Sequence, residues 1–156
     1  MIRLKTVRWK NFLATGNRFI EVKLDQKEMM LVVGKNGAGK STLIDAITFS
    51  LFGKPFKKVN KGQLVNSVNE RDTLTEIEFS VGSSEWKVCR GIKPNLFEIY
   101  HNGNLVNQDA KSMDYQKYLE EKVLKLNFKS FTQIVVLGSA SFVPFMQLTA
   151  NDRRII

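Results

Sequence analysis

Apolar and polar residues alternate along much of the chain, which predicts β-strands with one buried and one solvated face. The first alternating segments are residues 2–9 and 19–24. Further strands are expected at residues 73–81, 85–90 and 96–101. Asn102 and Gly103 form a pair typical of a tight hairpin, so residues 105–107 should pair back against the preceding strand. This spacing predicts an antiparallel meander.

Continuous apolar runs and helical spacing predict the remaining elements. Residues 29–33 and 134–137 are apolar runs with the length of buried strands. Helices are expected at residues 40–52, 111–126 and 148–156. Gly53 is a suitable residue to end the first helix, and Thr149 and Asp152 are suitable to begin the last. The chain stops one turn into that last helix.

A complete phosphate-binding loop lies between the first apolar run and the first helix. It reads Gly34-Lys35-Asn36-Gly37-Ala38-Gly39-Lys40-Ser41-Thr42. Its glycines allow positive φ angles, so successive N–H groups can turn inward around a phosphate, and the helix N-terminus behind them favours an anion. Lys40 is placed to reach the β- and γ-phosphates, and the Ser41 hydroxyl is placed to bind Mg²⁺. Strand, loop and helix together predict the binding of a nucleoside triphosphate.

The composition describes an ordinary soluble domain with a surplus of basic residues. Of the 156 residues, 43% are hydrophobic and 25% charged, and no apolar run approaches the length of a membrane span. A single cysteine, Cys89, excludes an internal disulfide and is expected to pack as a small apolar residue on a strand. We expect a cytoplasmic protein. The net charge of +9 favours nucleic acid as a partner, with an unspecialised basic surface as the alternative.

The segment that follows the first helix, residues 54–69, is polar and basic, and we expect it to be irregular. Its lysines are Lys54, Lys57, Lys58 and Lys61, and Lys93 lies in a later turn. Two interpretations stay open for these lysines, which are contacts with DNA phosphates or a solvated loop. His101 lies on the expected hairpin, and we give it no catalytic role.

A nucleotide-hydrolysing site also needs an acidic residue at a strand end, which completes the binding of Mg²⁺ and activates water. We find no apolar run that ends convincingly in Asp or Glu. Glu76 and Glu78 alternate with Ile77 and Phe79, so we expect both carboxylates on the solvated face of their strand. The sequence therefore predicts half of an ATPase.

The sequence around the loop resembles the ABC-type loop of SMC-like ATPases, through Asn36 before the second glycine and the Leu-Ile-Asp-Ala-Ile of residues 43–47. Residues 5–12 and 51–56 strengthen this resemblance. Residues 133–138 and 144–146 are similar to the ATPase subunits of T-even-like bacteriophage recombination exonucleases. The resemblance implies that residues 1–156 form the N-terminal lobe of an ATPase head. The fold would be α/β with α+β character, with a mixed sheet, an antiparallel meander and few helices.

The resemblance also implies roles for residues of the loop. The backbone of residues 36–40 would wrap the phosphates of ATP, with Lys40 as the charge, Ser41 on Mg²⁺ and Thr42 near the α-phosphate. The arginine that often follows the Asn-Phe turn in this family is replaced by Leu13. The family's glutamine sensor falls by register on Ser139, whose hydroxyl would reach the metal through water, and Gln133 before it is expected to be structural.

For the whole protein, the resemblance implies a long coiled coil beyond Ile156 and a C-terminal half with the signature loop and the acidic residues. Two heads would enclose two ATP molecules as a homodimer, and a separate metallonuclease subunit would cut DNA. The expected function is that of a DNA-dependent ATPase subunit of a recombination and repair exonuclease, with the fragment alone nearly inactive. The alternatives are an SMC-type DNA tether without a nuclease and, against the net charge, an ABC transporter subunit.

Overall fold

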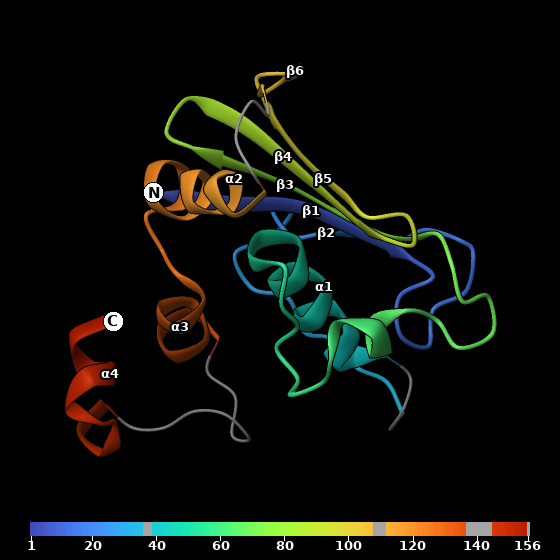
Figure 1. Ribbon diagram of the computed structural model, residues 1–156, viewed down its shortest axis with the longest axis horizontal. Helices are drawn as coiled ribbons and strands as arrows, with labels where there is room; N and C mark the ends of the chain where they lie inside the picture. The colour runs from blue at the N-terminus through green and yellow to red at the C-terminus, as the bar shows by residue number, and fades with distance from the viewer. Residues whose placement is uncertain (36–38, 108–111, 137–144, 156) are drawn as a thin grey trace.

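The computed structural model describes residues 1–35, 39–107, 112–136 and 145–155. Within them, an antiparallel sheet has the strand order β2-β1-β3-β4-β5-β6, and helix α1 lies against one of its faces (Figure 1). The strands are β1 Ile2–Lys10, β2 Ile20–Lys23, β3 Thr73–Val81, β4 Ser84–Ile92, β5 Leu96–His101 and β6 Asn104–Leu105. The α-helices are α1 Lys40–Phe52, α2 Ser112–Tyr118, α3 Phe128–Ser130 and α4 Ala150–Ile155. Short 3₁₀ helices span Lys61–Leu64 and Phe145–Gln147, and π-helical turns span Leu119–Leu124 and Phe131–Val135.

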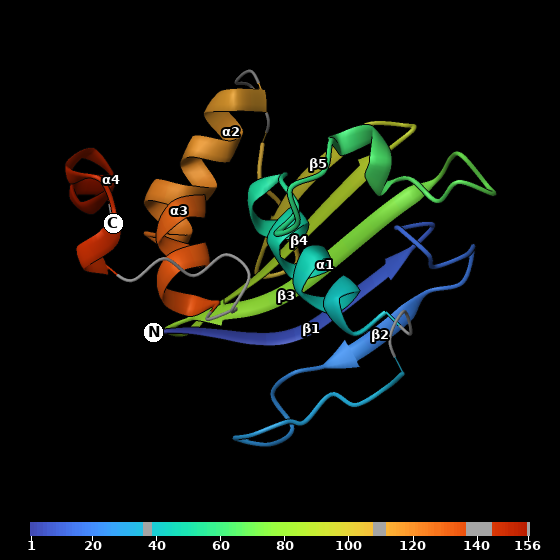
Figure 2. The same ribbon diagram turned by 90° about the horizontal axis from the view of Figure 1, so that it is seen from below.

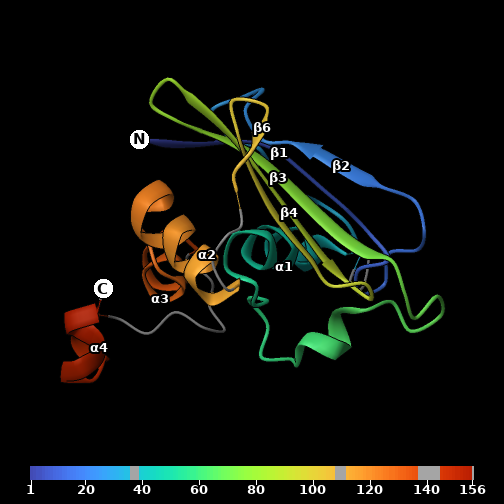
Figure 3. The ribbon, with the colours of Figure 1, turned by 45° about the horizontal axis from the view of Figure 1, so that its top comes forward.

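A row of apolar side chains crosses four neighbouring strands and forms one wall of the core. The register pairs Val7 with Ile77, Ile77 with Val88, and Val88 with Ile99. All four side chains are fully buried. Helix α1 packs against this face of the sheet (Figure 3). Apolar residues lie around most of the circumference of α1, and ten of its 13 residues are buried.

The alternating pattern predicted the strands and the meander correctly. Each strand expected from alternation is present, and Tyr100 pairs with Leu105 across the Asn102-Gly103 turn. The wholly antiparallel sheet of the described residues differs from the mixed sheet that we expected. Helix α1 has the predicted bounds and ends at Gly53, which has a φ of 69° and donates its N–H to the Phe49 carbonyl at 2.8 Å. Helix α4 begins as predicted, because the Asp152 N–H donates to Thr149 Oγ1 at 3.2 Å.

The prediction of a buried strand at residues 29–33 is wrong for this structure. The segment has no regular structure, and Met29, Leu31 and Val33 are 87%, 85% and 77% exposed. A strand that is buried on both faces needs partner strands and layers above and below it. The described residues supply none of these here, so the apolar run borders the sheet without joining it.

The prediction of a strand at residues 134–137 is also wrong as far as the structure describes it. Residues Phe131–Val135 form a π-helical turn that continues α3, while residue 137 lies outside the described residues. The ring of Phe131 lies 5.2 Å from that of Phe52, which draws this segment onto the end of α1. A short apolar run fits a strand or a helix equally well, and here the contact with α1 selects the helix.

The C-terminal helices form a group beyond the end of α1. Seen from below, α2 and α3 lie beside α1, and α4 lies beyond α3 (Figure 2). The helix expected at residues 111–126 is present as α2 and the following π-helical turn, with Tyr115, Leu119 and Val123 buried. Lys129 pairs with Asp152, which joins α3 to α4. None of the helices that the structure describes combines the length and the apolarity needed to cross a membrane.

Candidate nucleotide-binding site and lysine groove

The N-terminus of α1 has the backbone geometry of an anion site. Gly39 precedes the helix with a φ of 91°, a left-handed conformation that glycine adopts without strain. The first turn of α1 has no side-chain cap and no acidic residue. No side chain therefore competes with an anion for the first N–H groups, and the helix dipole adds a partial positive charge at the same point.

Lys40 and Ser41 begin the helix with their side chains near the loop. Lys40 Nζ donates to the carbonyl oxygen of Gly34, so the ammonium group lies between the two ends of the loop. Ser41 is exposed, whereas Thr42 is buried and donates its N–H to the Gly39 carbonyl at 3.0 Å. These positions suit an ammonium on the phosphates and a hydroxyl on a metal ion. Lys35 is exposed, and Asn36, Gly37 and Ala38 lie outside the described residues.

A turn from the N-terminal strand faces this end of the helix. Ala14 to Arg18, together with Ile20, Gly39 and Thr42, line a cavity of about 460 Å³. Asn11, which is 1% exposed with a φ of 47°, holds the turn through bonds to Asn17 and Asn69 and accepts one from the Thr73 hydroxyl. The sequence offered only the tolerance of asparagine for positive φ as a signal for this arrangement.

Leu13, at the position where the resemblance led us to expect an arginine, has a structural role. Its N–H donates to the Leu64 carbonyl at 2.7 Å, and its carbonyl accepts from Asn66 Nδ2 at 2.9 Å. The side chain packs against the hydrophobic core. Since Leu13 is apolar, Arg18 is the cationic residue of residues 14–18 that lines the cavity.

The opposite end of α1 is held by Arg90 of β4, which sequence reasoning missed. Arg90 Nε donates to the Ser50 carbonyl at 2.7 Å, and Nη2 donates to Leu51 O at 3.3 Å and to Gln116 Oε1. The guanidinium also lies 3.7 Å from the ring centre of Phe97. Burial lowers the pKa of Arg90 to about 9, so the group stays charged at pH 7. The sequence signal that could have identified Arg90 is its position two residues after Val88, which places a charged residue on the inward face of the strand.

The predicted solvent exposure of Glu76 is wrong, whereas that of Glu78 is correct. Glu76 lies on the outer face of the sheet as expected, but it is buried there by cations from the two neighbouring strands. Arg8 Nε donates to its carboxylate, and Lys87 Nζ lies 3.5 Å away. Alternation along one strand does not reveal such neighbours across the sheet. In the described part of the chain, no group of three His, Cys, Asp or Glu residues could hold a metal ion.

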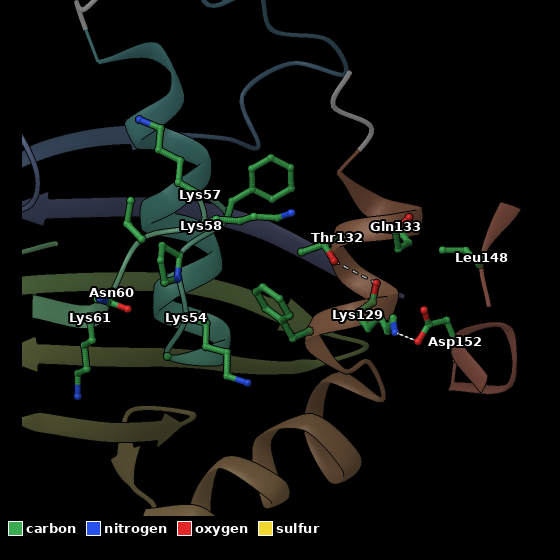
Figure 4. Close-up of a pocket in the computed structure, with 15 residues that line it drawn as sticks. Lys54, Lys57, Lys58, Asn60, Lys61, Lys129, Thr132, Gln133, Leu148 and Asp152 are labelled. Atoms are coloured by element: carbon green, nitrogen blue, oxygen red, sulfur yellow. Dashed lines mark hydrogen bonds and ion pairs between the residues drawn. The ribbon is translucent and has the colours of Figure 1, made fainter. Parts of the chain in front are cut away.

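The basic segment after α1 forms one side of what we call the lysine groove, lined by residues 53–61, 128, 129, 132, 133, 148 and 152 (Figure 4). Its volume is about 730 Å³. Asp45 in α1 fixes the segment, because its Oδ1 accepts the N–H of Lys57 at 2.9 Å. Its Oδ2 lies 3.6 Å from Lys57 Nζ, and burial raises the pKa of Asp45. Apart from the turn at Lys61–Leu64, the segment is irregular as predicted.

The other residues singled out in the sequence have simple positions. Lys93 is exposed in the turn after β4, and Lys61 Nζ donates to the nearby Asn95 at 3.4 Å. His101 stacks on Trp86 with ring centres 4.1 Å apart. Cys89 is buried as predicted. Ser139 lies outside the described residues, and Gln133 lines the lysine groove.

Fold and site define a phosphate-loop protein, in which a glycine-rich loop feeds a buried helix under a sheet. The chain belongs to the family described as AAA domain, whose sequence model matches residues 6–154. It is 44% identical over 152 residues to exonuclease subunit 2 of Enterobacteria phage T4, covering 97% of this chain and 27% of that protein. The same coverage holds for exonuclease subunit 2 of Escherichia phage RB69, at 43% identity. The chain thus spans about a quarter of the length of these relatives.

More distant relatives and solved structures agree with this assignment. The probable DNA double-strand break repair Rad50 ATPase of Aquifex aeolicus is 27% identical over 135 residues, covering 83% of this chain and 14% of that protein. A structure from work on ATP-driven dimerization and DNA-stimulated activation of SMC ATPases matches with a TM-score of 0.63 and 18% identity, over 97% of this chain and 95% of that one. The Smc head domain of Pyrococcus furiosus matches with a TM-score of 0.63 and 20% identity, over 86% of this chain and 36% of that one. These structures confirm the SMC-type head fold that the resemblance implied.

Proposed function

We propose that this chain is the N-terminal lobe of an ATPase head, in a protein that binds and hydrolyses ATP as a subunit of a DNA recombination and repair exonuclease. The observation that carries the proposal is the start of α1, where uncapped N–H groups, Lys40 and Ser41 meet at one point. The backbone of residues 34–42 would hold the phosphates, with Lys40 as the charge and Thr42 near the α-phosphate. Ser41 would bind Mg²⁺, with Ser139 as a further metal contact.

The exposed apolar run at residues 29–33 supports a missing second half. Together with Trp9, Val22, Lys40 and Leu43, residues of this run line a cavity of about 380 Å³ at the loop. We propose that a C-terminal half of the same protein, reached through a coiled coil, covers this run and supplies the acidic residues and a signature loop. Two such heads would enclose ATP as a homodimer, and ATP binding would shift the equilibrium towards the docked state.

DNA and a metallonuclease subunit are the proposed partners, in the cytoplasm of a host cell if the protein is encoded by a phage. The identity of 44% to a phage exonuclease subunit supports a nuclease partner over the SMC-type tether. Copurification of the full-length protein with a metallonuclease from the same source tests this partner. Lys54, Lys57, Lys58, Lys61 and Lys93 are the proposed contacts for DNA phosphates.

Lys40→Ala in the full-length protein tests the nucleotide site. Turnover should fall by at least about a hundredfold, because the substitution removes a preorganised charge from the transferring phosphate. Lys117→Ala removes an exposed lysine on α2 and serves as the matched control. DNA-dependent hydrolysis at the normal rate in the Lys40 variant would contradict the site.

The isolated 156-residue chain provides a second test. It should bind nucleotide weakly and hydrolyse almost none, because the groups that complete the metal site and activate water are proposed to lie in the other half. Addition of the separately expressed C-terminal half should restore hydrolysis. Rapid turnover by the chain alone would show that the site is complete without a second half.

A further inference from the structure

The cations of the lysine groove do not all face the same way. Lys57 is tied to Asp45 and, like Lys61, points away from α3 (Figure 4). Lys58 points across the groove toward Thr132 and Gln133, and Lys54 points toward the same side (Figure 4). Lys58 makes no hydrogen bond or ion pair with the residues that the structure describes, so its charge is available to a ligand.

The groove also carries aromatic surface beside these charges. Phe56 and Phe128 line it, and both are only partly buried. The ring of Phe128 also contacts Phe52, with ring centres 6.0 Å apart in an edge-on arrangement. Lys54 Nζ lies 5.7 Å from the centre of the Phe128 ring. The groove thus offers flat apolar faces and ammonium groups within the same space.

The charge balance of the groove is positive. Asp152 is the acidic residue among its lining residues, and it is already paired with Lys129. A ligand with repeated negative charge is therefore favoured. The acidic side chains of a peptide would use the ammonium groups but offer no aromatic face to the rings, and a duplex keeps its bases stacked inside. A single strand offers both phosphates and free base faces.

We propose that the lysine groove binds a single-stranded nucleic-acid segment, with phosphates on Lys54 and Lys58 and a base stacked on Phe56 or Phe128. This rests on the proposed function, because it specifies the form of DNA that the ATPase recognises at this point. The groove starts at Gly53 and runs back beside α1 to Lys57, which bonds to Asp45, and none of the loop residues that the structure describes (34, 35 and 39–42) lines it.

The test uses the full-length protein without nucleotide, a fluorescent 15-mer of thymidine and a blunt 15-base-pair duplex. Fluorescence anisotropy is measured between 50 and 200 mM salt. Lys54→Gln with Lys58→Gln should weaken 15-mer binding by about tenfold and reduce the magnitude of its salt slope by about 1.4, two phosphates at about 0.7 each. Duplex binding should change less than twofold. Lys117→Gln with Lys122→Gln, an equal charge change outside the groove, should leave 15-mer binding unchanged.

Stacking is tested by a ligand that lacks bases. The normal protein should prefer the 15-mer to an abasic strand of equal length by about fivefold or more, and Phe56→Leu should reduce that preference while keeping apolar bulk. Equal losses for duplex and single strand, an unchanged 15-mer affinity, or displacement by polyglutamate as effective as by unlabelled 15-mer would each overturn the proposal. Lys40→Ala should retain 15-mer binding, and the groove variants should retain ATP binding, which separates this result from a failure of the nucleotide site.

Discussion

Replacement of Arg90 by methionine should destabilise the lobe, because Arg90 joins the C-terminus of α1 to the sheet. The variant keeps an apolar stem inside the core but loses the guanidinium. Ser50 O then has no partner among the described residues, whereas Leu51 O keeps the bond from Gln116 Nε2 at 3.1 Å. The stacking on Phe97 is lost as well.

The size of the effect follows from these contacts. A hydrogen bond from a charged donor contributes about 1.5–3 kcal/mol net, and the bonds to Ser50 O and Gln116 Oε1 are both lost. A cation at a helix C-terminus adds up to about 2 kcal/mol. The deep burial that lowers the pKa of Arg90 to about 9 offsets part of this gain. We therefore expect a loss of about 3 kcal/mol, which for a chain of this size lowers Tm by about 6–12 °C.

Calorimetric unfolding of the chain measures this loss, and hydrogen exchange of the α1 amides gives the same comparison in the full-length protein. Arg90→Lys is the informative second variant, because one ammonium cannot reproduce the planar fork that reaches Ser50 and Gln116 together. It should lose nearly as much stability as the methionine variant. A Tm within 1 °C of the normal protein for either variant would refute the estimated contribution of the Arg90 contacts to stability. Nucleotide affinity measured well below Tm should stay unchanged, because the proposed phosphate site lies about 20 Å away at the other end of α1.

Four further predictions test other contacts. Gly53→Ala should lower the free energy of unfolding by about 1–2 kcal/mol, because alanine is strained at a φ of 69°. Its added Cβ would lie 3.0 Å from the Arg90 guanidinium, so the losses from Gly53→Ala and Arg90→Met should be less than additive. Thermal unfolding of the two single variants and the double variant measures both effects. The Cys89 thiol, whose pKa is raised to about 12 chiefly by burial, should resist a disulfide reagent at pH 8 until the protein unfolds, so rapid labelling of folded protein would contradict its burial. Because the unfolded thiol ionises near pH 9, the folded state should also lose stability as pH rises from about 9 towards 12, which pH-dependent urea unfolding measures. Glu76→Ala should lower the free energy of unfolding by about 2 kcal/mol, because Arg8 and Lys87 lose the carboxylate that they share. An unchanged urea midpoint would show that these ion pairs contribute nothing to stability.

Much of the fold could be predicted from the sequence because its signals are local. Alternation of apolar and polar residues gave the strands, and the Asn102-Gly103 pair gave the hairpin. The two wrong strands, at residues 29–33 and 134–137, are both short apolar runs without alternation. For such runs the outcome depends on which surface is available for packing. Residues 29–33 have no partner strand among the described residues and are exposed. Residues 134–137 follow Phe131, whose ring packs against Phe52 at the end of α1.

In the candidate sites, too, features built from consecutive residues were predictable and features built from distant residues were not. The phosphate loop and its helix were predictable, since consecutive residues provide the glycines, the lysine and the hydroxyl. Arg90, Asn11 and the aromatic side of the lysine groove were not, because each depends on residues distant in sequence. Phe128 meets Lys54 only through the packing of α3 on the end of α1, and no spacing along the chain encodes that meeting.

Helix α1 connects the two proposed binding regions, and its packing limits how one region can influence the other. Its N-terminus opens at the phosphate loop, and its C-terminus leads through Gly53 into the lysine groove. The helix packs against β1, β3 and β4, so it cannot bend or slide without repacking the core. Asp45, which holds the basic segment by the Lys57 N–H, is carried on the same rigid body. We therefore expect a signal from nucleotide to groove to pass through movement of segments packed around α1, rather than through deformation of α1 itself.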